Sequence, residues 1–311
     1  MKLLLIFPCY TEQEVLPVTS VKIFEYFNYL IDKGFISKDS KICFVDDGSV
    51  DNTWSLISKF RDKNVLGIKL SKNFGHQKAL LSALDTFKNN FDIYITLDVD
   101  LQDDLSVVTK MIEEYKKGFN IVYGVRNDRT TDSFFKRTTA NIFYQLMKKL
   151  GVNMVNNHAD FRLINNKVLL HFLEFKESHL FLRAIFPLVG FKSTNVYYKR
   201  LKREVGETKY PLKKMLIFAW EGITSFSVTP LKMILLIGFF AIIISIILIL
   251  WASYQLLTGH VITGWFSTIT LIILFGGMQT FALGIIGEYI GKIFIQTKNR
   301  PRYIIEDIIK N

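Results

Sequence analysis

The stretch from Met233 to Gly287 contains no Asp, Glu, Lys or Arg. About 20 apolar residues cross a bilayer core as a helix, so this stretch is too long for one span and fits two. A helical hairpin buried inside a soluble protein is the alternative, and the length of the stretch disfavours it. The sequence therefore predicts a hairpin of two transmembrane helices over residues 232–288.

Basic residues flank this hairpin on both sides: Lys209, Lys213, Lys214 and Lys232 precede it, and Lys292, Lys298, Arg300 and Arg302 follow it. By the positive-inside rule, both chain ends face the cytoplasm. Residues 211–231 mix apolar and aromatic residues with Lys, which predicts a segment lying in the membrane interface. Residues 289–311 are then predicted to be a basic cytoplasmic tail, in a multi-pass protein of the cell inner (plasma) membrane.

The formal net charge of +11 indicates that this basic chain binds a negatively charged partner. Anionic lipid headgroups or a phosphorylated substrate at the membrane surface would supply one. Nucleic acid is the competing explanation, and the uncharged hairpin makes it improbable.

Residues 1–210 are predicted to form an α/β domain. Apolar, β-rich runs occur at 2–7, 41–46, 65–70, 92–98 and 120–125, with intervals long enough for helices, such as Glu14 to Lys33 and His76 to Asn89. This alternation predicts a mainly parallel sheet wrapped by helices, whose ligands bind at the carboxyl ends of the strands. Neither GxGxxG nor GxxxxGK[ST] is present, which disfavours a dinucleotide dehydrogenase and a P-loop kinase.

An acidic cluster follows the fourth predicted strand. In the run LDVDLQDD, Asp98, Asp100 and Gln102 occupy alternate positions. If the backbone there is extended, the three side chains share one face, and hard oxygen ligands suit Mg²⁺ or Mn²⁺. A solvated acidic turn is the alternative.

A second acidic pair ends the second predicted strand. Asp46 and Asp47 are followed by Gly48 and Ser49, and Asp51 or Asn52 can cap a helix. A turn explains the glycine and the later polar residues, but two adjacent acids at a strand end repel each other unless a ligand or a donor compensates. Hydrogen bonding to a nucleotide base or ribose is the preferred interpretation, and a purely structural turn stays open.

Seven segments, in order over residues 7–211, carry a resemblance: FPCYTEQEVLP, VDDGSVDNT, LSKNFGHQKAL, LDVDLQDD, YGVRNDR, ADFRLI and REVGETKYP. With them the chain resembles family 2 glycosyltransferases of the GT-A fold. Within that family it is similar to polyprenyl-phosphate glycosyltransferases, such as bactoprenol glucosyltransferases and dolichol-phosphate mannose synthases.

The resemblance implies a nucleotide side of the site. Its expected members are Pro8, Tyr10, Glu12, Asp46, Asp47 and Asp98 for the nucleotide sugar, with Asp100 and Gln102 as ligands of Mg²⁺ or Mn²⁺. The opening motif reads YTE where the family commonly has YNE. Thr11 can still hydrogen-bond locally, so we expect unchanged chemistry.

The resemblance also implies an acceptor side. Arg126, Arg137, Arg203 and Lys209 are expected at the lipid phosphate, where the planar fork of Arg suits phosphate oxygens. Arg126, Arg137, Lys209 and Asp160 are the expected catalytic residues. Asp160 matches the family's candidate base, although a phosphate monoester with a second pKa near 6 is already mostly ionised at pH 7. A structural ion pair between Asp160 and Arg162 is the alternative.

The expected function is transfer of glucose from UDP-glucose to polyprenyl (undecaprenyl) phosphate, with inversion. GDP-mannose and UDP-aminosugar donors are alternatives. A processive polysaccharide synthase typically carries QxxRW and more spans, and neither is present. A non-catalytic scaffold has no reason to keep Asp98, Asp100, Gln102 and Asp160 together. Expected partners are the nucleotide sugar, polyprenyl phosphate and membrane lipids, with homo-oligomerisation left open.

Overall fold

The computed structural model describes residues 1–60, 64–127, 158–177, 181–199, 223–225, 227–258 and 264–310. The chain divides into two compact units. The sheet unit comprises Met1–Lys148, Asn153–Pro211 and Arg300–Asn311, and the hairpin unit comprises Lys149–Val152 and Leu212–Asn299.

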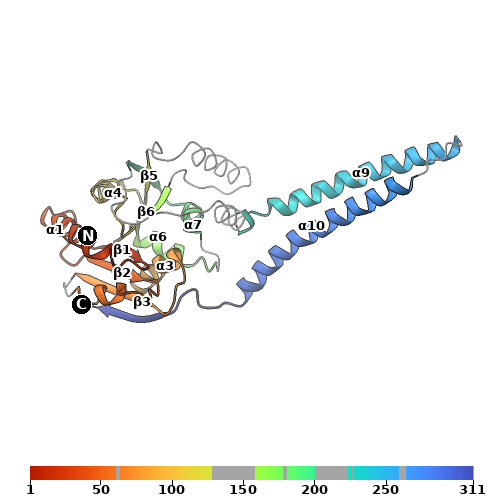
Figure 1. Cartoon of the computed structure of the whole chain (residues 1–311). Coiled ribbons are helices and arrows are strands. Elements are labelled where there is room, and N and C mark those ends of the chain that lie inside the picture. Colours follow the sequence, from red (N-terminus) through yellow and green to blue (C-terminus); the bar gives the residue numbers. More distant parts are fainter. Residues whose placement is uncertain are drawn as a thin grey trace. The chain divides into compact units, whose positions relative to one another are not determined.

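The sheet unit is built on one eight-stranded sheet of order β7-β5-β6-β4-β1-β2-β3-β8 (Figure 1). Its strands are β1 Leu3–Cys9, β2 Lys41–Asp46, β3 Val65–Leu70, β4 Ile93–Thr96, β5 Ile121–Arg126, β6 His158–Asn165, β7 Ser193–Tyr198 and β8 Ile305–Lys310. The pairs β1–β2, β2–β3, β1–β4 and β5–β7 are parallel. Strand β6 is antiparallel to β4 and β5, and β8 is antiparallel to β3. The predicted, mainly parallel α/β sheet is therefore confirmed.

Helices cover both faces of this sheet. They are α1 Leu16–Asp32, α2 Thr53–Ile57, α3 His76–Thr86, α4 Val107–Lys116, α6 Asn166–Leu173 and α7 Leu182–Val189. Helices α1 and α4 share a buried cluster with one face of the sheet. Helix α3 contacts β1 and β2, and α6 and α7 contact β6. Because both faces are covered, the central strands are apolar at consecutive positions rather than at alternate ones.

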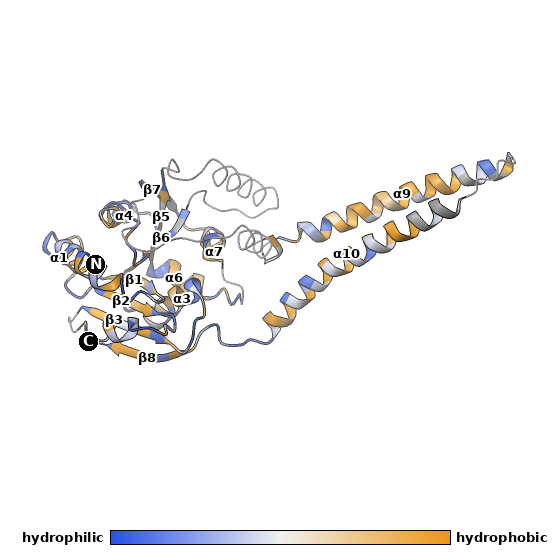
Figure 2. Ribbon diagram, viewed as in Figure 1, coloured by the Kyte–Doolittle hydropathy of each residue, from blue (hydrophilic) through white to orange (hydrophobic). Residues whose placement is uncertain are grey.

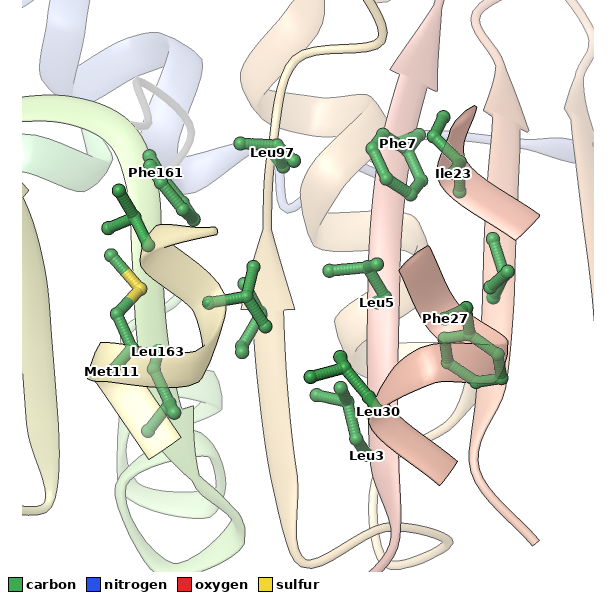
Figure 3. Packing of buried hydrophobic residues seen from close by; sticks show 14 of the residues in the cluster. Leu3, Leu5, Phe7, Ile23, Phe27, Leu30, Leu97, Met111, Phe161 and Leu163 are labelled. Carbon is green, nitrogen blue, oxygen red and sulfur yellow. The ribbon is translucent and has the colours of Figure 1, made fainter. Parts of the chain in front are cut away.

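Strand β1 illustrates this packing. All seven of its residues are buried. Leu3, Leu5 and Phe7 point toward Ile23, Phe27 and Leu30 of α1 (Figure 3). Burying one such large apolar side chain contributes about 1.5–3 kcal/mol. This cluster is thus the main support for the strand ends that carry the polar residues described below.

The C-terminal segment differs from the predicted basic tail. Helix α10 continues to Thr297, and residues 305–310 form β8 on the edge of the sheet. Lys69 of β3 pairs with Glu306 at 2.8 Å, and Tyr303 donates a hydrogen bond to Asp85 at 2.8 Å. The sequence prediction followed the basic residues, whereas the pairing depends on the free edge of β3, which local sequence does not reveal.

The hairpin unit contains two long apolar helices, α9 Thr229–Leu257 and α10 Trp265–Thr297 (Figure 2). Both are long and apolar enough to cross a membrane, over Thr229–Gln255 and Leu271–Thr297. Within this unit, Lys292 of α10 hydrogen-bonds Thr224 and Ser225, and Tyr289 donates to the carbonyl of Ser227 at 2.6 Å. The preceding interfacial segment predicted at 211–231 lies largely outside the described residues.

Candidate active site

The polar residues that the sequence singles out gather where parallel strands end. Strands β4, β1 and β2 are adjacent and parallel, so their carboxyl ends lie along one edge of the sheet. The loops that follow them begin with Leu97, Tyr10 and Asp47, respectively. Strand β6 runs the other way, with Arg162 opposite Thr96, which brings its first residues to the same edge.

The two acids at the end of β2 have different partners. Asp47 accepts hydrogen bonds from the backbone N–H groups of Phe74 at 2.7 Å and Gly75 at 2.9 Å. Asp46 accepts one from Ser49 N–H at 3.1 Å, and its Oδ2 is buried with no hydrogen-bond partner among the described residues. Burial raises the pKa of both carboxyls. Asp47 is therefore engaged in joining two loops, whereas Asp46 keeps one buried oxygen without a hydrogen bond among the described residues.

Gly48 explains why these loops lie so close. Its φ is +67°, and a Cβ there would come within 2.2 Å of the Lys72 carbonyl carbon. Only glycine accepts both the left-handed backbone and this contact. The loop after β2 is thereby fixed against the loop that leads into α3.

The three residues expected to contact the nucleotide sugar at the end of β1 and in the loop after it differ in their surroundings. Pro8 is buried within β1, Tyr10 is 45% exposed, and Glu12 N–H bonds the Thr53 hydroxyl at 2.9 Å. Thr11 has φ +54°, a region that β-branched residues rarely adopt. This gives a physical reason for the Asn that the family commonly has there, since Asn tolerates left-handed backbone.

The geometry predicted for Asp98, Asp100 and Gln102 is wrong in one respect. Strand β4 ends at Thr96, Val99 and Asp100 lie in a turn, and Leu101 has φ +50°. Alternation along an extended strand therefore does not bring these side chains together. The turn instead folds Asp100 back on the following backbone, where its Oδ1 accepts a hydrogen bond from Gln102 N–H at 3.2 Å.

The electrostatics of this turn show how crowded its acids are. Burial raises the pKa of the Asp98 carboxyl, and nearby His76 opposes that effect. The carboxylates of Asp100, Asp103 and Asp160 raise this pKa further. Within the described part of the chain, no group of three or more His, Cys, Asp and Glu is arranged to hold a metal by itself. One or two carboxylates completed by substrate phosphates are nevertheless an ordinary Mg²⁺ environment.

Asp160 is held between two arginines. Arg162 Nη2 lies 2.5 Å from its Oδ1, and Arg183 Nη2 lies 3.2 Å from its Oδ2. His76 Nε2 bridges toward it at 3.5 Å and toward Asp98 at 3.7 Å. Burial would raise the pKa of Asp160, but the positive charges of Arg183 and Arg162 hold it well below its usual value. The expected ion pair with Arg162 is thus present, and it favours the ionised form of Asp160.

Arg126 belongs to a separate network. Its Nη2 lies 3.2 Å from Asp103 Oδ1, and its Nε donates to the Tyr198 hydroxyl at 3.4 Å. Tyr198 in turn donates to Asp103 at 2.7 Å. This side chain is 25% exposed and has further N–H groups, so a role at the lipid phosphate stays a prediction. The other expected phosphate residues, Arg137, Arg203 and Lys209, lie outside the described residues.

Sequence reasoning missed three residues of this region: Arg183, Asp103 and Tyr198. Arg183 had a usable signal, because it is the single charged residue in the otherwise apolar run from Leu180 to Phe191. Asp103 was hidden inside an acidic run. Tyr198 lies 95 positions from its partner Asp103, a distance at which no local pattern can reveal a contact.

Comparison with known proteins agrees with this geometry. The model for "Glycosyl transferase family 2" matches residues 5–173. The chain belongs to glycosyl transferase family 2. A second model, the GtrB C-terminal hairpin, matches residues 229–293, which include α9 and most of α10.

Members of this family resemble the chain along nearly its whole length. The uncharacterized glycosyltransferase YkoT of Bacillus subtilis is 51% identical over 98% of this chain and 91% of its own. The SfII prophage-derived bactoprenol glucosyl transferase of Shigella flexneri is 36% identical over 98% of both chains. The prophage bactoprenol glucosyl transferase homolog of Escherichia coli is 35% identical over both chains in full. The expected GT-A family 2 glycosyltransferase is thereby confirmed.

Proposed function

We propose that this family 2 glycosyltransferase transfers glucose from UDP-glucose to polyprenyl phosphate, with inversion, at the cytoplasmic face of the membrane. The observation that carries the proposal is the alignment of both units, sheet and hairpin, with proteins named bactoprenol glucosyl transferase. A sheet unit alone would suit many acceptors. The apolar hairpin suits one that resides in the lipid.

The donor's nucleotide fits the loops after β1 and β2. Asp46 Oδ2 supplies a buried acceptor for a base or ribose, and exposed Tyr10 lies on the adjacent loop. Asp98, Asp100 and Gln102 offer the hard oxygen donors that Mg²⁺ or Mn²⁺ prefers. Asp100 and Gln102 are the proposed ligands, and a bound cation would stabilise the negative charge of the departing nucleoside diphosphate.

Asp160 serves this reaction by position rather than by proton transfer. A general base works best with a pKa near the operating pH, and Asp160 is held far below that by two arginines. The acceptor oxygen needs no base, because a phosphate monoester is already mostly ionised at pH 7. Asp160 instead holds Arg183 and His76 in place through the contacts of its Oδ2, next to Asp98.

The orientation in the membrane follows from chain connectivity. The chain leaves the sheet unit before α9 and returns to the same sheet as β8 after α10. Two crossings are the simplest path that begins and ends on one side, in agreement with the basic flanks. Residues around Thr258, at the end of α9, would then face the opposite side. A cysteine placed there should react with an impermeant reagent from outside intact cells, and labelling only after lysis would contradict this orientation.

The function can be tested with the full-length protein in detergent. We would mix it with undecaprenyl phosphate and radiolabelled UDP-glucose, and measure label in the organic-extractable lipid. Label should appear in the presence of Mg²⁺ or Mn²⁺, disappear with a chelator, and fall nearly to background for Asp100→Asn. A panel with GDP-mannose and UDP-N-acetylhexosamines tests the donor. Absence of lipid label with every donor would refute the function, and full activity in excess chelator would refute the metal.

A further inference from the structure

Two guanidinium groups, one buried and one partly exposed, contact Asp160. Arg162 comes from the same strand and is 1% exposed, whereas Arg183 comes from α7 and is 35% exposed. Of these two guanidinium groups, only that of Arg183 reaches the surface, because Arg162 is fully buried.

Arg162 is sufficient as the buried counterion. Its Nη2 contacts Asp160, and its guanidinium lies 4.7 Å from the centre of the Phe186 ring. Its Nε and Nη1 are buried with no hydrogen-bond partner among the described residues. Such unpaired donors are costly, so Arg162 depends strongly on Asp160 as its anion. Asp160 thus has a buried counterion within its own strand, and Arg183 is the more exposed of its two cationic partners.

Arg183 is also held on a rigid support. It lies in the first turn of α7, whose neighbouring residues Leu182, Ala184 and Ile185 are buried. The backbone at the start of α7 is also held in place, because the N–H of Leu182 donates a hydrogen bond to Gln77 Oε1 of α3 at 3.2 Å. The guanidinium donates to both Asp160 oxygens, from Nε at 3.5 Å and from Nη2 at 3.2 Å. A group fixed in this way is suited to orient a ligand.

We propose that Arg183 binds the phosphate of the lipid acceptor, with Asp160 orienting its guanidinium and Arg162 compensating the Asp160 charge. The inference rests on the proposed function and assigns a residue to its acceptor. A phosphate monoester that approaches Asp98 and Asp160 is repelled unless a cation meets it. Arg183 meets that need with a planar fork that matches phosphate oxygens. The donor's phosphates are instead assigned to the turn at Asp98 and Asp100.

The experiment uses the full-length protein in detergent and farnesyl phosphate as a short prenyl phosphate probe. Its binding is compared with that of farnesol, which lacks the phosphate, and with that of UDP. Arg183→Gln should weaken farnesyl phosphate binding about 10- to 100-fold, the range expected for lost hydrogen bonds to a charged group. Binding of farnesol and UDP should stay within about twofold of the wild type, a change too small to reflect a lost charged contact. Arg183→Lys keeps the charge without the fork, so it should show a smaller loss.

Lys167→Gln is the matched control. Lys167 is an exposed cation on neighbouring α6, over the ring of Phe191, and its removal changes the net charge equally. It should leave all three affinities unchanged. Thermal unfolding of each variant checks the fold, and Arg183→Lys provides the test if Arg183→Gln does not fold.

Three results would overturn the inference. The first is weaker UDP binding with unchanged farnesyl phosphate binding, which would place Arg183 at the donor. The second is a lower kcat with unchanged phosphate affinity, which would leave it only a support for Asp160. The third is wild-type protein that binds farnesyl phosphate no better than farnesol. If no sugar is transferred but Arg183→Gln selectively loses farnesyl phosphate, the proposed function fails and this inference stands.

Discussion

Strand β1 and helix α9 are both rich in Leu, Ile and Phe, but β1 buries these side chains and α9 exposes them. In β1, Leu3, Leu5 and Phe7 are 0% exposed. In α9, Leu235, Ile249 and Leu250 are 78%, 64% and 66% exposed. The side chains are alike, so the difference lies in what surrounds them. Strand β1 buries its apolar surface against its own chain, whereas α9 exposes an apolar surface that the proposed membrane location would cover.

The largest expected effect comes from making the same kind of truncation in the buried strand β1 and in the exposed helix α9. Leu5→Ala leaves a cavity and should lower the free energy of unfolding of the sheet unit by about 2–5 kcal/mol. Ile244→Ala, at a position 54% exposed on α9, should cost far less, because the removed atoms contact little protein and detergent can fill the space. The midpoint of thermal unfolding in detergent measures both. Equal losses would mean that Ile244 packs against protein, and the comparison would fail there.

Two glycines provide a second comparison between the sheet unit and the hairpin unit. Gly48→Ala places a methyl group 2.2 Å from the Lys72 backbone at φ +67°, which should cost about 2–4 kcal/mol through overlap and left-handed strain. Gly284→Ala, in α10, has nothing within 4 Å of the new Cβ. It should be neutral or add up to about 1 kcal/mol of helix stability. Denaturant titration monitors both variants. A marked loss for Gly284→Ala would indicate that this face of α10 contacts a second chain.

A smaller gain is expected where packing imposes strained backbone on the sheet unit. Thr11 has φ +54°, and Thr11→Asn should stabilise the protein by about 1 kcal/mol, since Asn adopts this region more readily. The N–H of Thr11 bonds the Ser49 hydroxyl at 2.9 Å, a contact that the substitution preserves. Thermal unfolding measures the gain, and transferase activity should persist. Destabilisation would show that the threonine hydroxyl, which donates to the Tyr10 carbonyl at 2.7 Å, matters more than the strain.

The smallest expected effect concerns how the stability of the protein depends on pH in the acidic range. The pKa of Asp160 is lowered in the folded protein, so its ion pairs contribute stability above its ordinary pKa of about 3.9 and lose it as pH falls further. The stability difference between wild type and Asp160→Asn should therefore be constant from pH 8 to 5 and shrink only below about pH 4. For the same reason, kcat should show no ionisation of Asp160 above pH 5. A difference that already narrows near pH 6 would mean that Arg162 and Arg183 do not hold this carboxylate ionised.

The sequence by itself determined the elements that local pattern controls. Apolar runs bounded by polar loops marked β1 to β5, and the uncharged stretch from Met233 marked both long helices. Seven ordered motifs were enough for the family. Each of these features depends on neighbouring residues, because strand burial and membrane length are properties of a continuous segment.

Only the tertiary structure decided which polar side chains belong together. The alternation of Asp98, Asp100 and Gln102 looked like one face of a strand, but the chain turns after Thr96. Asp46 and Asp47 looked equivalent until Phe74 and Gly75 took up both oxygens of Asp47. In the same way, β8 joined the edge of β3, and Arg183 of α7 reached Asp160 of β6. These outcomes depend on contacts between distant segments, and their geometry is set by packing rather than by residue type.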